Sequence, residues 1–322
     1  MPLLSIIIFL PFFASIAVLF IPRQSISLIR TTAIFISFLI FTLSSILLFT
    51  YKTGVQGFSF LESVNWITLD LGNLGRLSID YIVGIDGISL PLLWMSSLIF
   101  FIALISSSSI KEKQKGYYSL MLLLLAAVNG CFAALDFFLF FLFFEFMLLP
   151  MYFLIGIWGG PRREYAAIKF FLYTLLGSVF ILLVMIALYI SVKDPLQSKD
   201  GFIVHTFRFD YLADLNNLIP GSLLSPGNTS TFLGISFRGW AFLLLLIGFL
   251  IKLPSFPFHT WLPDAHVEAP TPVSVILAAV LLKIGGYGLI RIAIPFFPLE
   301  AIQYAPYIAF IGMFSILWAA YN

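Results

Sequence analysis

The sequence has a single cysteine and lacks the common cofactor motifs. Cys131 lies inside an apolar run, so the chain cannot form an intrachain disulfide, and no CxxC or Cys/His cluster is present to hold iron, zinc or haem. The glycine patterns GxGxxG and GxxxxGK[ST], which bind dinucleotides and phosphates, are also missing. We therefore expect no flavin, nicotinamide, nucleotide or metal cofactor in this chain.

Charge is also scarce. Asp, Glu, Lys and Arg make up 10% of the 322 residues, against roughly 25% in a typical soluble domain, and the formal net charge is only +2. The basic residues fall in short loops and form no patch, so nucleic acid is not an expected partner. Apolar residues are abundant, since 61% of the chain is hydrophobic and the mean hydropathy is +1.07. This composition predicts a polytopic membrane protein.

Apolar runs of about 20 residues predict the fold class, an all-α membrane helix bundle. No basic residue precedes the first run and no small-residue cleavage site follows it, so we interpret it as a retained helix and not as a signal peptide. The pattern FSFLESVNWITLDL predicts a short surface hairpin within 53–87, and the loop 193–234 is expected to hold a short amphipathic helix near 207–218. Nine membrane helices are expected, at 3–21, 31–50, 88–109, 117–135, 137–157, 166–191, 239–258, 271–293 and 303–321.

Loop charges predict the orientation of the bundle. Alternate loops are basic, whereas the loop between the second and third helices is acidic. The positive-inside rule places the basic loops in the cytoplasm or matrix and the N-terminus on the other side. The basic loops hold Arg23, Arg30, Lys111, Lys113, Lys115, Arg162 and Arg163, and the acidic loop holds Glu62, Asp70, Asp80 and Asp86.

Glu145 stands near the middle of its expected span, in FFLFFLFFEFMLLP. A charged side chain at the centre of a membrane helix costs about 2.5 to 3.5 kcal/mol on translocon scales unless it is paired, hydrated or protonated. A neighbouring charge then decides whether the carboxyl group holds its proton. Glu145 is therefore a candidate proton carrier.

The stretch 251–288 combines prolines with ionisable residues at membrane depth. Pro254 and Pro257 are expected to break the seventh helix and to free backbone carbonyls that can hold water. Lys252 precedes this break, and Lys283 lies near the centre of the next helix. Lysines in such surroundings are able to exchange protons near neutral pH. The stretch resembles a broken helix that lines a polar path.

Two histidines, His259 and His266, follow the break, and imidazole titrates in the physiological range. Structural roles compete with proton transfer: lysines can snorkel, a glutamate can hold helices together by pairing, and histidines can cap or pack. Asp264 and Glu268 are expected at the membrane surface, solvated or capping. The candidate proton relay consists of Glu145, Lys252, Lys283, His259 and His266.

Two long blocks carry a family resemblance. FFEFMLLPMYFLIGIWGGPRREYAAIKFFLYTLLGS and KLPSFPFHTWLPDAHVEAPTPVSVILAAVLLKIGGYG closely resemble the antiporter-like membrane subunits of proton-pumping NADH:quinone oxidoreductase, respiratory complex I, in the family of subunit M or chain 4. The resemblance implies that Glu145 pairs with Lys252 on a broken helix. It also implies that Lys283 links this pair to a second half-channel through histidines and water.

The resemblance also implies a domain organisation. The family fold has two inverted five-helix repeats, and this sequence ends where the second would begin. We expect N-terminal helices with a hairpin-like loop over 1–116, the first repeat with its broken helix over 117–293, and the start of a truncated second repeat over 294–322.

By resemblance, flavin, iron–sulfur clusters and quinone belong to partner subunits, and this chain moves protons in response to their electron transfer. The expected partners are other membrane subunits of the complex, especially neighbouring antiporter-like subunits, and the lipid bilayer. The expected location is the bacterial plasma membrane, with the mitochondrial inner membrane as the alternative. Two other functions remain open: a subunit of a multi-subunit cation/proton antiporter or membrane-bound hydrogenase, and a scaffold whose buried charges only hold helices in register.

Overall fold

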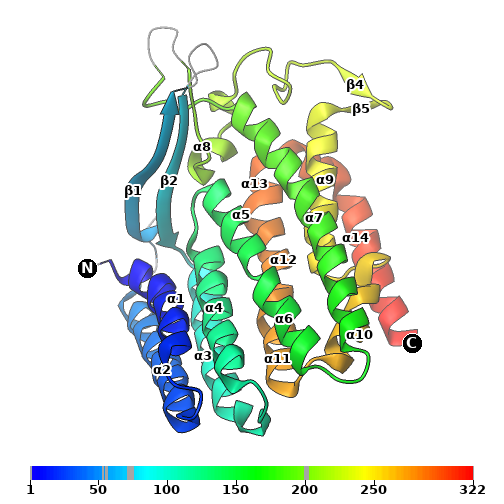
Figure 1. Cartoon of the computed structure of the whole chain (residues 1–322). Helices are drawn as coiled ribbons and strands as arrows, with labels where there is room; N and C mark the ends of the chain where they lie inside the picture. Colours follow the sequence, from blue (N-terminus) through cyan, green and yellow to red (C-terminus); the bar gives the residue numbers. More distant parts are fainter. Residues whose placement is uncertain (1, 53, 55–56, 71–75, 199–202, 322) are drawn as a thin grey trace.

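The molecule is a bundle of long helices with a β-hairpin and extended loops at one end (Figure 1). The computed structural model describes every residue except 1, 53, 55–56, 71–75, 199–202 and 322. Within this described part, eight helical segments are long and apolar enough to cross a membrane. The remaining expected span is divided into α9 (Phe237–Lys252) and α10 (Trp261–Glu268). The prediction of a polytopic membrane helix bundle is confirmed.

The first spans are continuous helices, whereas later spans contain interruptions. The 3-10 turn η2 (Ser107–Ser109) extends α3, and α5 and α6 follow each other as one span. The helices of this half are α1 (Leu3–Phe20), α2 (Ile26–Thr50), α3 (Ser89–Ser106), α4 (Gln114–Ala133), α5 (Phe137–Phe146), α6 (Leu148–Trp158) and α7 (Arg163–Ser191).

The span after α10 contains two π-helical turns. It consists of α11 (Thr271–Ile276), the π turn η5 (Leu277–Leu281), α12 (Leu282–Gly288), the π turn η6 (Leu289–Ala293) and α13 (Ile294–Phe296). The last helix, α14, covers Pro298–Tyr321. Helices dominate because hydrocarbon offers no partner to backbone groups, which a helix satisfies internally.

α4 lies at the centre of the N-terminal half. It packs against α1, α2, α3, α5 and α6, and 83% of its most apolar window is buried. The lipid-facing helices around it expose large apolar side chains such as Phe35 and Leu172. This pattern fits a bundle that is surrounded by hydrocarbon.

The predicted surface hairpin is present and is longer than expected. Strands β1 (Ser59–Asp70) and β2 (Arg76–Ile85) pair antiparallel, with Val64 opposite Tyr81. The short strand β3 (Val204–His205) adds to β2 in parallel. An antiparallel bridge between Val83 and Ala134 attaches the chain before α5 to the same sheet.

The long loop after α7 contains the expected short helix. It forms as α8 (Phe209–Ala213), followed by the 3-10 turn η3 (Leu215–Asn217). A small hairpin of β4 (Thr231–Phe232) and β5 (Ile235–Ser236) then leads into α9. These loops and the β1–β2 hairpin lie at the same end of the bundle (Figure 1).

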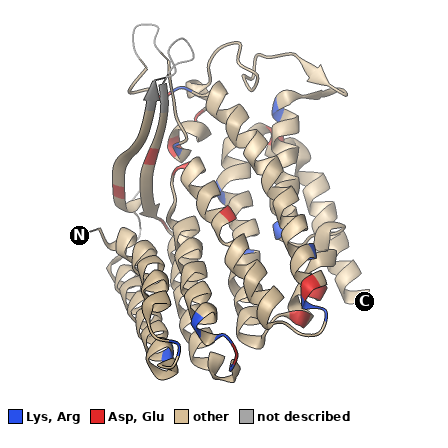
Figure 2. Ribbon diagram, viewed as in Figure 1, with Lys and Arg blue, Asp and Glu red and all other residues tan. Residues whose placement is uncertain are grey.

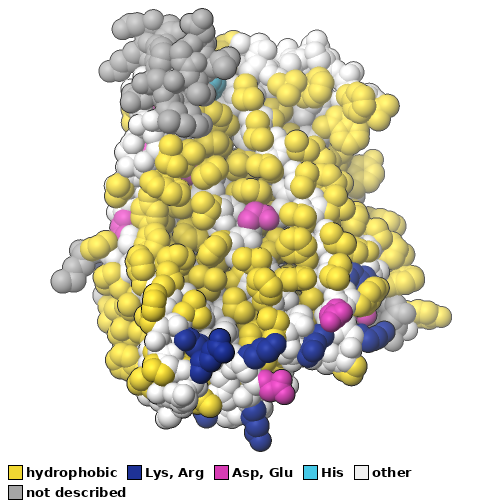
Figure 3. Space-filling model, in the orientation of Figure 1, with side chains coloured by type: hydrophobic (Ala, Val, Ile, Leu, Met, Phe, Trp, Pro, Cys, Tyr) yellow, Lys and Arg dark blue, Asp and Glu magenta, His cyan; other side chains and the backbone are white. Residues whose placement is uncertain are grey.

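The basic loops lie together at the opposite end, as Figure 2 shows. In Figure 3 the basic side chains form a row beneath a broad hydrophobic face, and one acidic side chain stands in the middle of that face. The basic loops thus share one end, and the orientation predicted from their charges, with the hairpin end facing away from the cytoplasm or matrix, stays a prediction.

Two glycines allow α7 and α9 to approach closely. A Cβ atom added to Gly248 would lie 2.8 Å from the carbonyl oxygen of Gly177, and one added to Gly177 would lie 2.9 Å from the carbonyl oxygen of Gly248. Small residues at a crossing permit this backbone approach in membrane helices. The contact fixes α9 one turn before Lys252.

A buried ion pair ties the start of α9 to the start of α14. Arg238 is 5% exposed and Glu300 is 8% exposed. The Arg238 guanidinium donates to Glu300 Oε1 at 2.8 Å and to Oε2 at 3.3 Å. It also donates to the carbonyl oxygens of Leu224 and Phe296, so its donors are well used.

Candidate functional site

The break in the helix follows Lys252, where α9 ends. Proline lacks an amide hydrogen, so Pro254 and Pro257 cannot continue the hydrogen-bond ladder. The 3-10 turn η4 (Phe258–Thr260) then leads into α10. The carbonyl oxygen of Ile251 accepts a hydrogen bond from the Trp261 indole at 2.9 Å, so a side chain beyond the break pairs a backbone group before it.

Lys252 is a buried cation beside α5. Lys252 is 3% exposed, and its Nζ donates a hydrogen bond to the carbonyl oxygen of Phe144 at 3.3 Å. The same nitrogen lies 3.5 Å from the centroid of the Phe144 ring, a cation–π contact that helps offset the loss of water. Phe144 directly precedes Glu145, so the fold brings the α9 lysine near the α5 glutamate. Among the described residues no ion pair within 4.0 Å joins the two side chains, so the expected Glu145–Lys252 pair is not closed in this structure.

Glu145 is half-buried and is affected by two polar neighbours. The Lys252 ammonium interacts electrostatically with its carboxylate, and the Ser178 hydroxyl of α7 lies beside it. Within the described residues, the buried Oε1 atom has no hydrogen-bond partner. A carboxyl group with one unpaired oxygen and a neighbouring cation can change its protonation when that cation moves.

Lys283 lies apart from this pair. It is exposed on α12, just after η5, and its Nζ donates to the carbonyl oxygen of Ala278 at 2.7 Å. In the part of the chain that the structure describes, no hydrogen bond or ion pair joins it to Lys252 or Glu145. Its side chain is placed on the outer face of the bundle.

The two histidines make different contacts. The His259 ring stacks on Phe256 with centroids 5.7 Å apart, and its buried Nδ1 has no partner among the described residues. His266 on α10 shares a short hydrogen bond with the Ser274 hydroxyl of α11. The structure therefore places one histidine against an aromatic side chain and the other at a helix–helix junction.

Of the two roles predicted for Glu268, solvated or capping, the solvated one is wrong. Glu268 is 7% exposed, its carboxylate accepts the Arg162 amide at 2.9 Å, and its carbonyl oxygen accepts the Gly160 amide at 2.9 Å. Lys169 and Asp264 form a second link at 2.7 Å. Both contacts tie α10 to the start of α7, which explains the polar residues of the WGGPRREY block.

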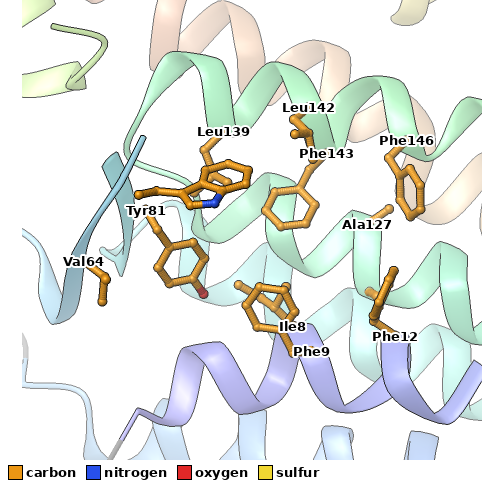
Figure 4. A pocket seen from close by; sticks show the side chains of 12 residues that line it. Ile8, Phe9, Phe12, Val64, Tyr81, Ala127, Leu139, Leu142, Phe143 and Phe146 are labelled. Atoms are coloured by element: carbon orange, nitrogen blue, oxygen red, sulfur yellow. The ribbon is translucent and has the colours of Figure 1, made fainter. Parts of the chain in front are cut away.

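An apolar cavity of about 600 Å³ lies elsewhere, between α1, α4, α5 and the hairpin (Figure 4). Phe9, Phe12, Phe143 and Phe146 point into it, and Tyr81 stands at one side. Its wall contains no carboxylate, ammonium or imidazole group. It suits hydrocarbon and is separate from the ionisable residues. Within the described residues, no three His, Cys, Asp or Glu side chains group as a metal site.

Comparisons with known proteins place this geometry in a family. A model of the family described as NADH:quinone oxidoreductase/Mrp antiporter, TM, matches residues 134–322. NADH-quinone oxidoreductase subunit M of Rhodobacter capsulatus is 37% identical over 325 residues, which cover 99% of this chain and 58% of that protein. Subunit M of Rickettsia conorii is 35% identical over 326 residues, 99% of this chain and 59% of that protein. The chain thus spans less than two thirds of the length of these relatives.

Solved structures share the fold. A chain of respiratory complex I from Thermus thermophilus with bound NADH is 26% identical, with a TM-score of 0.72 over 97% of this chain and 56% of that one. A chain of the Mrp complex from Dietzia sp. is 23% identical, with a TM-score of 0.66 over 93% of this chain and 29% of that one. Because the family match covers more than half of its residues, the chain belongs to the NADH:quinone oxidoreductase/Mrp antiporter transmembrane family.

Proposed function

We propose that this chain is the proton-translocating, antiporter-like membrane subunit, subunit M or chain 4, of an NADH:quinone oxidoreductase. The observation that carries the proposal is the buried Lys252 ammonium, which rests on Phe144 beside Glu145 at a broken helix. The names of the Rhodobacter and Rickettsia relatives support the choice of complex.

The mechanism uses the separation between Lys252 and Glu145. At an effective dielectric constant of about 20, moving two unit charges from roughly 4 to roughly 8 Å apart changes their interaction by about 2 kcal/mol. A change of this size alters proton binding more than tenfold. We assign the flavin, iron–sulfur clusters and quinone to partner subunits, whose electron transfer changes the separation and so drives the proton.

The other relay residues have peripheral roles in this proposal. Lys283, on the exposed face of α12, passes the proton on towards a second half-channel and the next subunit. His259 lies in η4, just before α10, and His266 lies within α10; we assign both to the relay through water near the helix break. We assign the first repeat to 117–293, the N-terminal helices to 1–116 and the start of the second repeat to 294–322.

The partners in this proposal are the other membrane subunits of the complex, especially neighbouring antiporter-like subunits. The chain is an integral multi-pass membrane protein by its family and its helices. We place it in a bacterial plasma membrane, with the mitochondrial inner membrane as the alternative.

The proposal is tested with Glu145→Gln and Lys252→Met in the full-length gene. Membrane vesicles are assayed for NADH:quinone turnover and proton pumping, and native gels report assembly. The exposed residues Glu164 and Lys111 supply matched controls as Glu164→Gln and Lys111→Met. We expect both relay variants to assemble and to lose pumping, with the controls unchanged. Normal pumping in assembled Glu145→Gln would contradict the relay, and loss of assembly alone would indicate a scaffold.

A further inference from the structure

A second buried carboxyl group lies at the hairpin end of the bundle, on the helix that carries Glu145. Asp136 is fully buried and immediately precedes α5, nine positions before Glu145. Its Oδ1 accepts the Leu139 amide at 3.0 Å and caps the helix. Its Oδ2 is buried and, among the described residues, has no hydrogen-bond partner.

The backbone around Asp136 is fixed on both sides. The amide of Leu135 donates to Ile82 of β2 at 2.9 Å, and the amide of Phe137 donates to Phe207 at 2.8 Å. Asp136 itself forms an antiparallel bridge with Arg208. These contacts hold its carboxyl group against β2, where it faces the carboxyl group and the backbone of Asp80.

The charges around the two carboxyl groups do not balance. The Arg208 guanidinium acts on Asp80, but it already donates to both carboxylate oxygens of Asp210, at 3.1 and 2.7 Å. The Asp194 carboxylate adds a further negative charge near Asp80. His205 on β3 is turned to the Val192 carbonyl oxygen, 3.1 Å from its Nδ1. Among the described residues, no cation acts on the Asp136 carboxyl group.

Protonation of one carboxyl group removes one of these negative charges. An ionised carboxylate accepts hydrogen bonds on both oxygens, whereas a protonated one donates from one of them. With a proton on Oδ2, Asp136 becomes a donor, and the Asp80 carboxylate, which acts on it electrostatically, is the candidate acceptor. Burial raises the pKa of Asp136 to about 7, with the Asp80 carboxylate acting in the same direction and the backbone amides of Leu139, Phe138 and Asp80 opposing it. The pKa of Asp80 is also raised, mainly by burial and further by the Asp194 carboxylate.

We propose that Asp136 and Asp80 hold one proton between them and form a proton-exchange site at the hairpin end of the bundle, opposite the basic loops. Because Asp136 Oδ2 is buried, the exchange runs through Asp80, which is partly exposed: the proton passes between Asp136 Oδ2 and the Asp80 carboxylate, and from there to water on that side. The site rests on the proposed proton translocation, since it connects the Glu145 helix to the compartment beyond the hairpin.

The test uses Asp136→Asn in the complete complex. An asparagine side chain also caps a helix, so the fold is kept while the proton site is removed. Asp136→Ser, another capping residue, serves if the asparagine variant does not assemble. The matched control is Asp214→Asn, because Asp214 caps the exposed turn η3 through Asn216.

Infrared spectra across pH report protonated carboxyl groups directly, and vesicle assays report pumping. We expect a carboxyl band that titrates near pH 7, is lost in Asp136→Asn and remains in Asp214→Asn, together with a several-fold loss of pumping in Asp136→Asn only. An unchanged band, a band that titrates below about pH 5, unchanged pumping, or failure of both capping variants to assemble would overturn the proposal. We expect Glu145→Gln to retain the carboxyl band of Asp136, so a failure of the proposed relay and a failure of this site can be told apart.

Discussion

The crossing of α7 and α9 gives a sharp prediction for Gly248→Ala. The new Cβ would lie 2.8 Å from the Gly177 carbonyl oxygen and 2.8 Å from Ile181 Cγ1. The isoleucine side chain can adjust, but the carbonyl belongs to the backbone of a packed helix. The two helices must therefore move apart where α9 approaches Lys252.

Two effects of opposite sign decide the size of the change. Replacing glycine by alanine inside a helix gains about 0.8 to 1.0 kcal/mol of helix propensity. Inserting a methyl group into a packed interface costs about 1 to 3 kcal/mol. At Gly248 we expect the packing cost to exceed the gain in helix propensity, because the contact is with backbone, and the net loss of stability is up to about 2 kcal/mol.

Gly156→Ala is the matched control. Its Cβ would meet only the Ala167 side chain, at an ordinary 3.4 Å, so helix propensity should prevail and the variant should be slightly more stable. Denaturant unfolding in detergent measures both free energies, and vesicle pumping measures the effect on the Lys252 site. A stabilised Gly248→Ala with normal pumping would refute the idea that this crossing sets the position of Lys252.

Three other results are expected. Arg238→Met leaves the Glu300 carboxylate buried without its cation and should lower the free energy of unfolding by about 3 to 5 kcal/mol. Adding Glu300→Gln to this variant should restore most of the loss, and the absence of rescue would contradict the ion pair. Trp261→Phe leaves the Ile251 carbonyl oxygen unpaired and should cost about 1 to 3 kcal/mol, with faster amide exchange in α10 and not in α2. Burial raises the pKa of Asp136 to about 7, so the stability contributed by its protonated form is complete below the unfolded-state pKa of about 3.9 and is lost as pH rises through 7, by about 4 kcal/mol. Asp136→Asn should therefore make Tm depend less on pH. An unaltered dependence of Tm on pH would contradict this.

Local pattern was enough to predict much of the fold. Runs of apolar residues gave the membrane helices, alternation gave the hairpin, and loop charge gave the common end of the basic loops. The order of residues around Lys252 and Pro254 identified a place where the helix ends, and α9 does end at Lys252. Each of these features depends on neighbours in sequence.

Contacts between distant residues could not be predicted in this way. Glu268 is buried because it pairs with the amide of Arg162, 106 positions away, and nothing near it in sequence announces that partner. The same holds for Arg238 and Glu300. Asp136 was missed although a signal existed, since an aspartate directly before an apolar helix is a typical N-cap. The position of Lys283 on an outer face depends on the helix geometry before it.

That geometry depends on the π turns. A π turn holds one more residue than an α turn, and each residue of an α-helix turns the chain by about 100°. Lys283 follows η5 and Arg291 lies within η6, so the direction of each side chain reflects an extra residue. In this span, removing or adding one residue would mainly rotate the following side chains about the helix axis. A single-residue deletion in 277–281 would thus turn Lys283 to a different neighbour while hardly shortening the helix.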